Sequence, residues 1–283
     1  MLGRMVLLHL ADDAELKVDW TSRRAESDAL PFQAEAPQSF LDLAGEQGGY
    51  DYAINCIAVL KNEAENCGPK GQEAAHQINA VFPHELARMA AEIHCKVIHV
   101  STDGVFAPDS GVCLESDLPA PADVYGRTKL LGEPSLPNAL TLRCSIIGPN
   151  PLKKTGLFEW VAGQPRRARI TGYQDQLWRG VTTLQFAQLC ARMIRENLFA
   201  RLRKQSAVHH FCPNAAVTKY QLLQLLSRRF RPDLEVEPAN GGRVNRVLET
   251  RGPLREICGA ERPMDVAIEE LSTYIHGPKA AGE

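Results

Sequence analysis

The sequence contains no apolar run of about 20 residues, the length that a helix needs to cross a membrane, and no clear excess of charge of one sign. Its 32 Lys and Arg residues stand against 34 Asp and Glu residues, which gives a formal net charge of −2 at pH 7. A chain of this balance has no overall field that attracts nucleic acid or an anionic membrane. It also opens without the pattern of a secretory signal. We therefore expect a cytoplasmic protein whose partner is a small molecule, and neither nucleic acid nor a membrane.

Regularly spaced cysteine pairs are also missing. The chain has eight cysteines, and three of them, Cys56, Cys144 and Cys212, stand at the ends of apolar runs without a paired spacing. A disulfide framework or a zinc site would need such spacings. We predict buried free thiols in a reducing compartment and no metal site.

The chain is long and apolar enough to bury the core of one or two domains, with 283 residues of which 44% are hydrophobic. Its most informative stretch begins with an apolar run, Val97 to Val100, that ends abruptly in Ser101, Thr102 and Asp103. This pattern predicts a buried strand that delivers hydroxyls and a carboxylate to the edge of a sheet.

Tyr125 and Lys129 follow this strand and are four residues apart. If residues 125–133 are helical, the spacing puts the phenol and the ammonium on one face, one turn apart. An ammonium near the phenol would lower the pKa of Tyr125 from its ordinary value of about 10 and make it a proton donor near neutrality. Thr102, Tyr125 and Lys129 are therefore the candidate catalytic residues, and we expect them to move a proton onto a carbonyl oxygen. The alternative is a surface Tyr and Lys at helical spacing by chance.

Local patterns elsewhere predict further elements. Apolar residues at spacings of three and four indicate one helix from Ala74 to Ile93, in which Pro83 would be a kink. Residues 106–124 show no regular period and are predicted to form a surface loop. Capping boxes at Thr182 and Thr218 predict the starts of two helices.

The segments STDGVF and VYGRTKLLGE, residues 101–106 and 124–133, resemble the signature of the extended short-chain dehydrogenase/reductases, and within them the dTDP-4-dehydrorhamnose reductase-like sugar-nucleotide enzymes. The resemblance continues, in family order, through YDYAINCIAV, INAVFPHELARMAAE, LTLRCSIIG and LWRGVTTLQFAQL. It implies an α/β fold with a Rossmann-like doubly wound parallel sheet. We expect residues 1–148, together with roughly 175–198, to form the NADP-binding domain, and residues 149–174 and 199–283 to form a smaller substrate-binding region.

The glycine-rich turn that holds the pyrophosphate in this fold is nearly absent. Family members have Gly-x-x-Gly-x-x-Gly there, and Met1-Leu2-Gly3 resembles only its last three positions. A helical pattern begins directly at Leu2, so the first strand is missing as well. We expect a truncated N-terminus, either because the start was assigned to an internal Met, which we favour, or because the chain holds its cofactor poorly. Leu2 and Gly3 are the expected cofactor contacts that remain.

Two arginines indicate which cofactor binds. Arg23 and Arg24 follow a predicted strand, Glu15 to Trp20, at the position where an acidic residue would bind the ribose hydroxyls of NAD. Arginines suit the additional phosphate of NADP, so NADP(H) is expected in preference to NAD(H), and a solvated turn is the alternative. Further cofactor contacts implied by the resemblance are Ile57, Ala58, Ser101, Tyr125 and Lys129.

The expected substrate is a nucleotide-activated deoxysugar with a keto group. The resemblance implies that Thr102, Asp103, Arg143 and Ile146 bind it, with Asp103 orienting a sugar hydroxyl. Gly104 and Ile146 stand where the rhamnose-forming enzymes have aromatic residues, so the sequence leaves the identity of the sugar open.

The expected reaction is NADPH-dependent reduction of this keto group. Tyr125 would give its proton to the carbonyl oxygen, Thr102 would hydrogen-bond that oxygen, and Lys129 would hold the nicotinamide ribose. Two alternatives stay open: an epimerase or dehydratase of the same fold, and a non-catalytic NADP-binding subunit that resembles the regulatory subunit of methionine adenosyltransferase. The sequence also leaves open whether the protein is a monomer or a homodimer.

Overall fold

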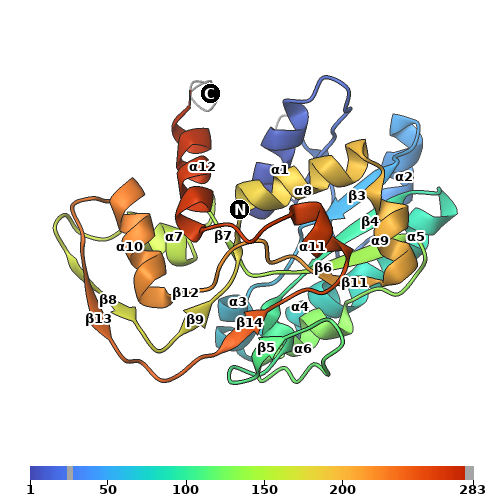
Figure 1. Ribbon diagram of the computed structural model, residues 1–283. Coiled ribbons are helices and arrows are strands. Elements are labelled where there is room, and N and C mark those ends of the chain that lie inside the picture. Colours follow the sequence, from blue (N-terminus) through green and yellow to red (C-terminus); the bar gives the residue numbers. More distant parts are fainter. Residues whose placement is uncertain (24–27, 278–283) are drawn as a thin grey trace.

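The computed structural model describes residues 1–23 and 28–277. It is built around a parallel four-stranded sheet in the order β11-β6-β4-β3 (Figure 1). The strands of this sheet are β3 (Tyr52–Asn55), β4 (Lys96–Ser101), β6 (Ala139–Arg143) and β11 (Val208–His210). The α/β fold with a Rossmann-like parallel sheet is therefore confirmed.

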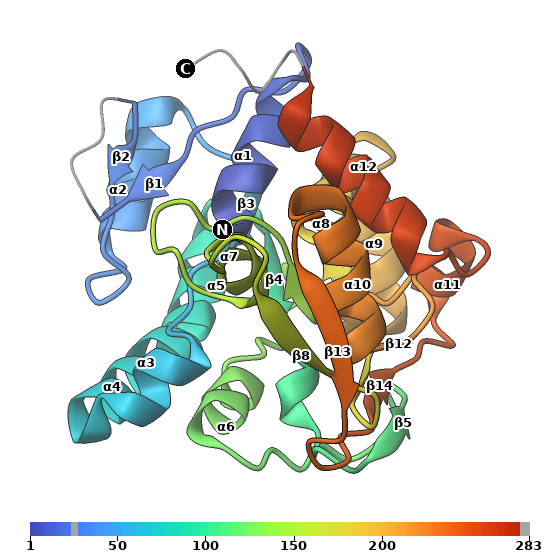
Figure 2. The ribbon, with the colours of Figure 1, turned by 90° about the vertical axis from the view of Figure 1, so that its left-hand side faces the viewer.

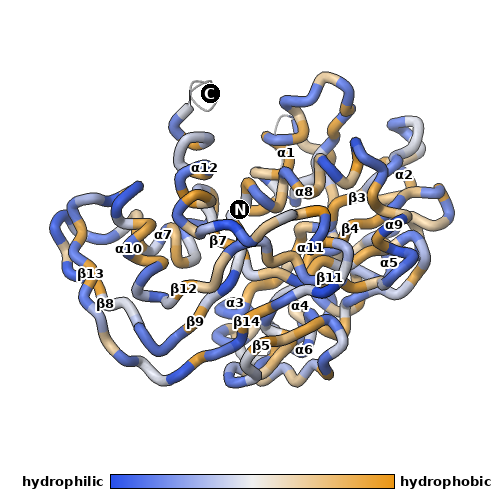
Figure 3. Tube along the Cα trace, viewed as in Figure 1, coloured by the Kyte–Doolittle hydropathy of each residue, from blue (hydrophilic) through white to orange (hydrophobic). Residues whose placement is uncertain are grey.

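Helices cover both faces of the sheet (Figure 1). One face carries α1 (Leu2–Ala11), α8 (Thr183–Arg195) and α9 (Leu198–Gln205), and the other carries α2 (Ser39–Gln47) and α5 (Phe82–Glu92). Successive side chains of a strand point to opposite faces, so within β4 Ile98 packs under α1 and α8 while Val97 packs under α5. The sheet is thus buried on both sides. In Figure 3 its strands are coloured mainly as hydrophobic.

A third apolar cluster, apart from the two on the faces of the sheet, holds together the remaining large elements, whose ribbons are shown in Figure 2. It joins α7 (Leu157–Ala162), α10 (Lys219–Phe230) and α12 (Met264–His276) to the parallel pair β8 (Arg169–Tyr173) and β13 (Glu235–Ala239). The capping boxes predicted at Thr182 and Thr218 are present at the starts of α8 and α10. The predicted domain boundaries stay a prediction. Residues 208–210, which fall in the predicted substrate-binding region, form strand β11 of the central sheet.

Further two-stranded ladders lie outside the four-stranded sheet. They are β1 (Thr21–Ser22) with β2 (Leu30–Pro31), β5 (Gly111–Cys113) with β14 (Arg246–Leu248), β7 (Ile146–Ile147) with β10 (Val181–Thr182), and β9 (Leu177–Trp178) with β12 (Val217–Thr218). The predicted loop over residues 106–124 was partly wrong, because β5 pairs with a strand far along the chain. The predicted strand Glu15 to Trp20 was also wrong: residues 16–20 have no ladder partner in the described part of the chain.

The helical stretch before β4 is divided into α3 (Lys61–Asn66), α4 (Gly68–Ala75), the π-helix η1 (His76–Val81) and α5. Residues 74–92 are helical throughout, as predicted, but the π-helix η1 interrupts the α-helical geometry over residues 76–81. Pro83 lies in the first turn of α5, directly after this π-helix, and cannot donate a backbone hydrogen bond to it. The distortion is a π-turn, a feature that often accompanies functional sites.

The short 3₁₀ helix η2 (Asp103–Val105), α6 (Val124–Leu131) and α11 (Pro253–Cys258) complete the fold. Within the described residues, none of the helices combines the length and the apolar character that a membrane span requires.

Candidate active site

The candidate site lies where β4 ends and α6 begins. Ser101 is the last residue of β4, Thr102 follows it, and η2 starts at Asp103. The side chain of Asp123 caps α6 by accepting a 2.7 Å hydrogen bond from the backbone N–H of Gly126. Capping at Asp123 sets the helix so that Tyr125 lies in its first turn, with Lys129 on the same face one turn later.

Thr102 lies between a carboxylate and the candidate proton donor. Its Oγ1 donates to Asp103 Oδ1 at 3.1 Å and accepts from the N–H of Gly104 at 3.0 Å. Burial raises the pKa of Tyr125 to about 12, and a hydrogen bond with Thr102 acts in the opposite direction. Gly104 lies beside the same ring, since a Cβ added there would be 3.8 Å from Tyr125 Cδ1. The sequence-based expectation of a lowered Tyr125 pKa was therefore wrong.

The ammonium of Lys129 is directed at β4. Its Nζ donates to the carbonyl oxygen of Val100 at 2.5 Å and lies 3.3 Å from Nε2 of His99. Burial lowers the pKa of Lys129 to about 8, although Glu133 acts to raise it. Desolvation opposes the charged forms of both the Tyr125 phenol and the Lys129 amine. It therefore outweighs the expected lowering of the Tyr125 pKa by the Lys129 ammonium.

His99 connects this lysine to the neighbouring strand. Its ring is completely buried, and Nδ1 lies 3.1 Å from Asn55 Nδ2 at the end of β3. Asn55 Oδ1 in turn accepts from the N–H of Ile57 at 3.0 Å. Burial, with a smaller effect from Lys129, holds the pKa of His99 well below its ordinary value. Sequence reasoning missed both Asn55 and His99, although a histidine inside an apolar strand was a usable signal.

Asn79 on the π-helix fixes the backbone that follows β3. Its Oδ1 accepts from the N–H of Val59 at 2.8 Å, and its Nδ2 donates to Val59 O at 2.9 Å and to Thr128 Oγ1 at 3.2 Å. The residues between Asn55 and Val59, which include the predicted cofactor contacts Ile57 and Ala58, are therefore held between η1 and α6.

The other predicted cofactor residues lie near that segment or in the first loop. Leu2 is buried, and a Cβ added to Gly3 would be 3.5 Å from Cys56 Cβ, so the start of α1 lies beside the end of β3. Arg23 has a side chain that is 67% exposed and lies 4.0 Å from Glu35. Arg24 falls outside the described residues.

Ser101 and Arg143 share a buried carboxylate. Arg143 donates from Nε and Nη2 to the two oxygens of Glu133 at 2.8 and 2.7 Å, and Ser101 Oγ donates to Glu133 Oε1 at 2.7 Å. The guanidinium also lies over the ring of Phe106, 5.3 Å from its centroid. Its Nη1 has no hydrogen-bond partner within the described residues. Contact of Arg143 with a substrate stays a prediction.

Two cationic side chains, Arg246 and Lys219, interact with Asp103. Asp103 Oδ2 accepts from Nε of Arg246 at 3.3 Å, and Lys219 Nζ lies 5.5 Å from the centroid of the Trp178 ring. Burial lowers the pKa of Lys219, and Asp103 acts to raise it. Ile146, in β7, is half-buried and packs against the cluster under α1 and α8.

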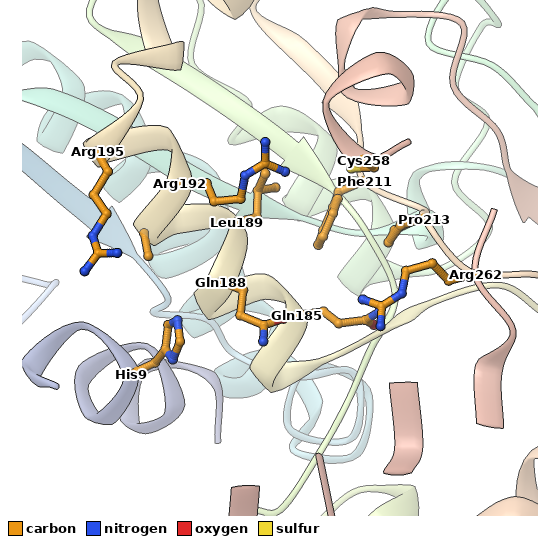
Figure 4. Close-up of a pocket in the computed structure, with 11 residues that line it drawn as sticks. His9, Gln185, Gln188, Leu189, Arg192, Arg195, Phe211, Pro213, Cys258 and Arg262 are labelled. Carbon is orange, nitrogen blue, oxygen red and sulfur yellow. The ribbon is translucent and has the colours of Figure 1, made fainter. Parts of the chain in front are cut away.

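A separate cavity of about 350 Å³ lies along α8, and its other lining residues are His9 of α1, Phe211 and Pro213 after β11, Cys258 of α11, and Arg262 (Figure 4). The predicted site residues are all missing from its lining within the described part of the chain. Each arginine that lines it is paired with a carboxylate: Arg192 with Glu196, Arg195 with Asp13, and Arg262 with Glu270.

Comparison with known proteins identifies the family. Residues 35–247, well over half of the chain, match the family model described as the RmlD substrate binding domain. The chain belongs to this family. The resemblance to dTDP-4-dehydrorhamnose reductase-like enzymes noted in STDGVF and VYGRTKLLGE is thereby confirmed.

Individual relatives match different parts of the chain. A dTDP-4-dehydrorhamnose reductase from Mycolicibacterium smegmatis is 39% identical over 99 residues, which are 33% of this chain and 29% of that protein. The methionine adenosyltransferase 2 subunit beta of Rattus norvegicus is 25% identical over 226 residues, which are 76% of this chain and 62% of that protein. Both alignments span less than two thirds of the relative's length.

A solved structure supports the fold. The dTDP-4-dehydrorhamnose reductase from Bacillus anthracis in complex with NADP matches 88% of this chain and 90% of its own chain, with a TM-score of 0.65 and 17% sequence identity. This chain therefore shares its fold with that protein at low sequence identity.

The buried amine of Lys129 should leave a signature in the pH dependence of stability. Its folded-state pKa is lowered to about 8 from an ordinary 10.5. Between these pH values the unfolded state binds more protons than the folded state, so the wild type gains stability with rising pH. We expect urea unfolding to show the wild type gaining stability relative to Lys129→Met from pH 8 to pH 10. Lys70→Met, at an exposed position of α4, is the control. A wild-type to Lys129→Met difference that stays constant over this range would contradict the prediction.

Proposed function

We propose that this protein reduces a keto group on a nucleotide-activated deoxysugar with NADPH, as an oxidoreductase of the short-chain dehydrogenase/reductase type. The observation that carries the proposal is the gathering of Thr102, Tyr125 and Lys129 at the carboxyl end of β4 in an RmlD-family chain. In α/β sheets of this kind, ligands bind at the carboxyl ends of the strands.

The residues near the ends of β3 and β4 fit a dinucleotide. The first turn of α1, which has unpaired N–H groups and the positive end of the helix dipole, lies beside the segment after β3. Asn79 holds that segment in place, and Arg23 offers an exposed guanidinium for the additional phosphate of NADP. Leu2, Gly3, Ile57, Ala58, Ser101 and Lys129 are the residues proposed to hold the cofactor. When bound, NADPH supplies the hydride.

The protonation state of Tyr125 suits reduction. With its pKa raised to about 12, the phenol keeps its proton at neutral pH and acts as a general acid toward the carbonyl oxygen. Thr102 Oγ1 accepts from Gly104, so its own proton can turn from Asp103 to the same oxygen. Asp103 and Arg143 are proposed to orient the sugar, with Ile146 beside them.

The deciding experiment measures NADPH oxidation with the purified protein and a panel of dTDP- and UDP-linked 4-keto sugars. We expect one NADPH to be consumed for each hydroxyl formed. Conversion of the sugar without net NADPH consumption would instead indicate an epimerase or dehydratase. Absence of turnover together with a stoichiometric protein partner in purification would favour a regulatory subunit.

A further inference from the structure

The buried residues Asn55, His99 and Lys129 form a polar chain that links β3, β4 and α6. Asn55 Nδ2 and His99 Nδ1 are 3.1 Å apart, and His99 Nε2 and Lys129 Nζ are 3.3 Å apart. All three side chains are at most 4% exposed, so water does not compete for these contacts. The direction of each hydrogen bond can therefore be deduced from donors and acceptors alone.

The orientation of the Asn55 amide is set by the backbone. The N–H of Ile57 can only donate, and it points at Asn55 Oδ1 from 3.0 Å. The amide nitrogen of Asn55 must then be the atom that faces His99, and an amide nitrogen is only a donor. His99 Nδ1 is consequently an acceptor and carries no proton.

A neutral imidazole with an unprotonated Nδ1 carries its proton on Nε2. In this chain that N–H is directed at Lys129 Nζ. An ammonium has three donors and no lone pair, so it would oppose the His99 N–H, whereas a neutral amine can accept it. The amine keeps two further N–H groups, one of which donates to Val100 O at 2.5 Å.

In the described part of the chain, no unpaired carboxylate stabilises the ammonium form of Lys129 against the N–H of His99. Glu133 acts to raise the pKa of Lys129, but both its oxygens are engaged by Arg143. The other groups that face the amine, Cys56 and Cys144, are thiols whose pKa burial raises to about 12 and above. Tyr125, from α6 itself, is a neutral phenol near pH 7, and His84 acts to lower the pKa of His99.

We propose that Asn55 and His99 are positioning residues: Asn55 locks His99 in the Nε2–H form, and that N–H disfavours the ammonium form of Lys129. The pair thereby adjusts the proton affinity of Lys129 to the neutral range in which the site works. The lowered pKa of Lys129, about 8, agrees with this geometry. The proposal rests on the proposed function for its meaning, but its tests need neither substrate nor cofactor.

The first test is the tautomer of His99, read from ring ¹⁵N chemical shifts in the apo protein and assigned with His99→Gln. We expect a protonated Nε2 and an unprotonated Nδ1 at pH 7, with no second proton gained down to about pH 5, well below the ordinary histidine pKa. A proton on Nδ1 at neutral pH would overturn the proposal.

The second test changes the tautomer. Asn55→Asp keeps the shape and the acceptor for Ile57, but its carboxylate demands a proton on His99 Nδ1, so Nε2 becomes an acceptor for the Lys129 ammonium. The pH titration of the Lys129 ¹³Cε signal should then show at least a roughly tenfold increase in proton affinity. His99→Leu removes the opposing N–H and should also increase the proton affinity of Lys129. The control His276→Gln, at the exposed end of α12, should leave that affinity unchanged. An unchanged Lys129 titration in both site variants would overturn the proposal, even if the protein reduces no sugar.

Discussion

Replacing Tyr125 by Phe is expected to lower the turnover of the keto sugar by roughly 10²- to 10⁴-fold, the contribution typical of a positioned general acid. The substitution removes only the phenolic hydroxyl. The ring stays packed beside Gly104, so binding of NADPH should be nearly unchanged. Steady-state NADPH oxidation measures the first quantity, and titration of the protein with NADPH, followed by cofactor fluorescence, measures the second.

Two companion variants give this experiment its controls. Tyr173→Phe removes a hydroxyl from a tyrosine of β8 that is 38% exposed, and its turnover should equal that of the wild type. Thr102→Val should also lose turnover, because it removes the hydroxyl that bonds with the phenol. Near-wild-type turnover in Tyr125→Phe would eliminate the proposed proton donor.

The parts of the site that could be predicted from the sequence depend on short-range geometry. The run from Val97 to Asp103 indicates a strand end because the change from apolar to polar residues can be read from consecutive positions, and β4 ends at Ser101 as expected. The spacing of Tyr125 and Lys129 needs only the period of a helix, and α6 supplies it.

The parts that could not be predicted depend on contacts between distant segments. The contact of Asn55 with His99 requires the register of β3 on β4, in which these two residues are directly paired. The direction of the Tyr125 pKa shift required knowing how deeply the ring is buried, which spacing on a helix does not reveal. The ladder of β5 with β14 brings Arg246 to Asp103 in the same way.

The expected substrate pocket likewise combines positions that the sequence could indicate with contacts between distant segments that it could not. The interpretation that Gly104 and Ile146 replace two aromatic substrate contacts of the rhamnose-forming enzymes stays a prediction. The structure brings Lys219 of α10 over the ring of Trp178 of β9, and Asp103 acts to raise the pKa of this lysine. Neither residue could be assigned from sequence, because their proximity results from the antiparallel pairing of β9 with β12.

The largest effect on stability is expected from the buried ion pair of Glu133 and Arg143. Their side chains are 7% and 5% exposed, so Glu133→Leu leaves a guanidinium buried without its counterion. Removing one member of such a pair typically costs about 3–5 kcal/mol, whereas replacing both by apolar residues is often close to neutral. We therefore expect Glu133→Leu to lower the free energy of unfolding by that amount, and Glu133→Leu combined with Arg143→Met to recover most of it. Urea unfolding at neutral pH measures both.

The exposed pair of Arg88 and Glu92 on α5 is the matched control for this experiment. Both side chains are about half exposed, so Glu92→Leu should change the free energy of unfolding by no more than about 1 kcal/mol. If Glu133→Leu cost no more than this control, the Ser101, Glu133 and Arg143 network would not be what holds the end of β4 in place. If the double variant were stable but inactive, the network would be needed for the chemistry rather than for folding. Ser101 would then keep its position in β4 but lose the Glu133 carboxylate that orients its hydroxyl.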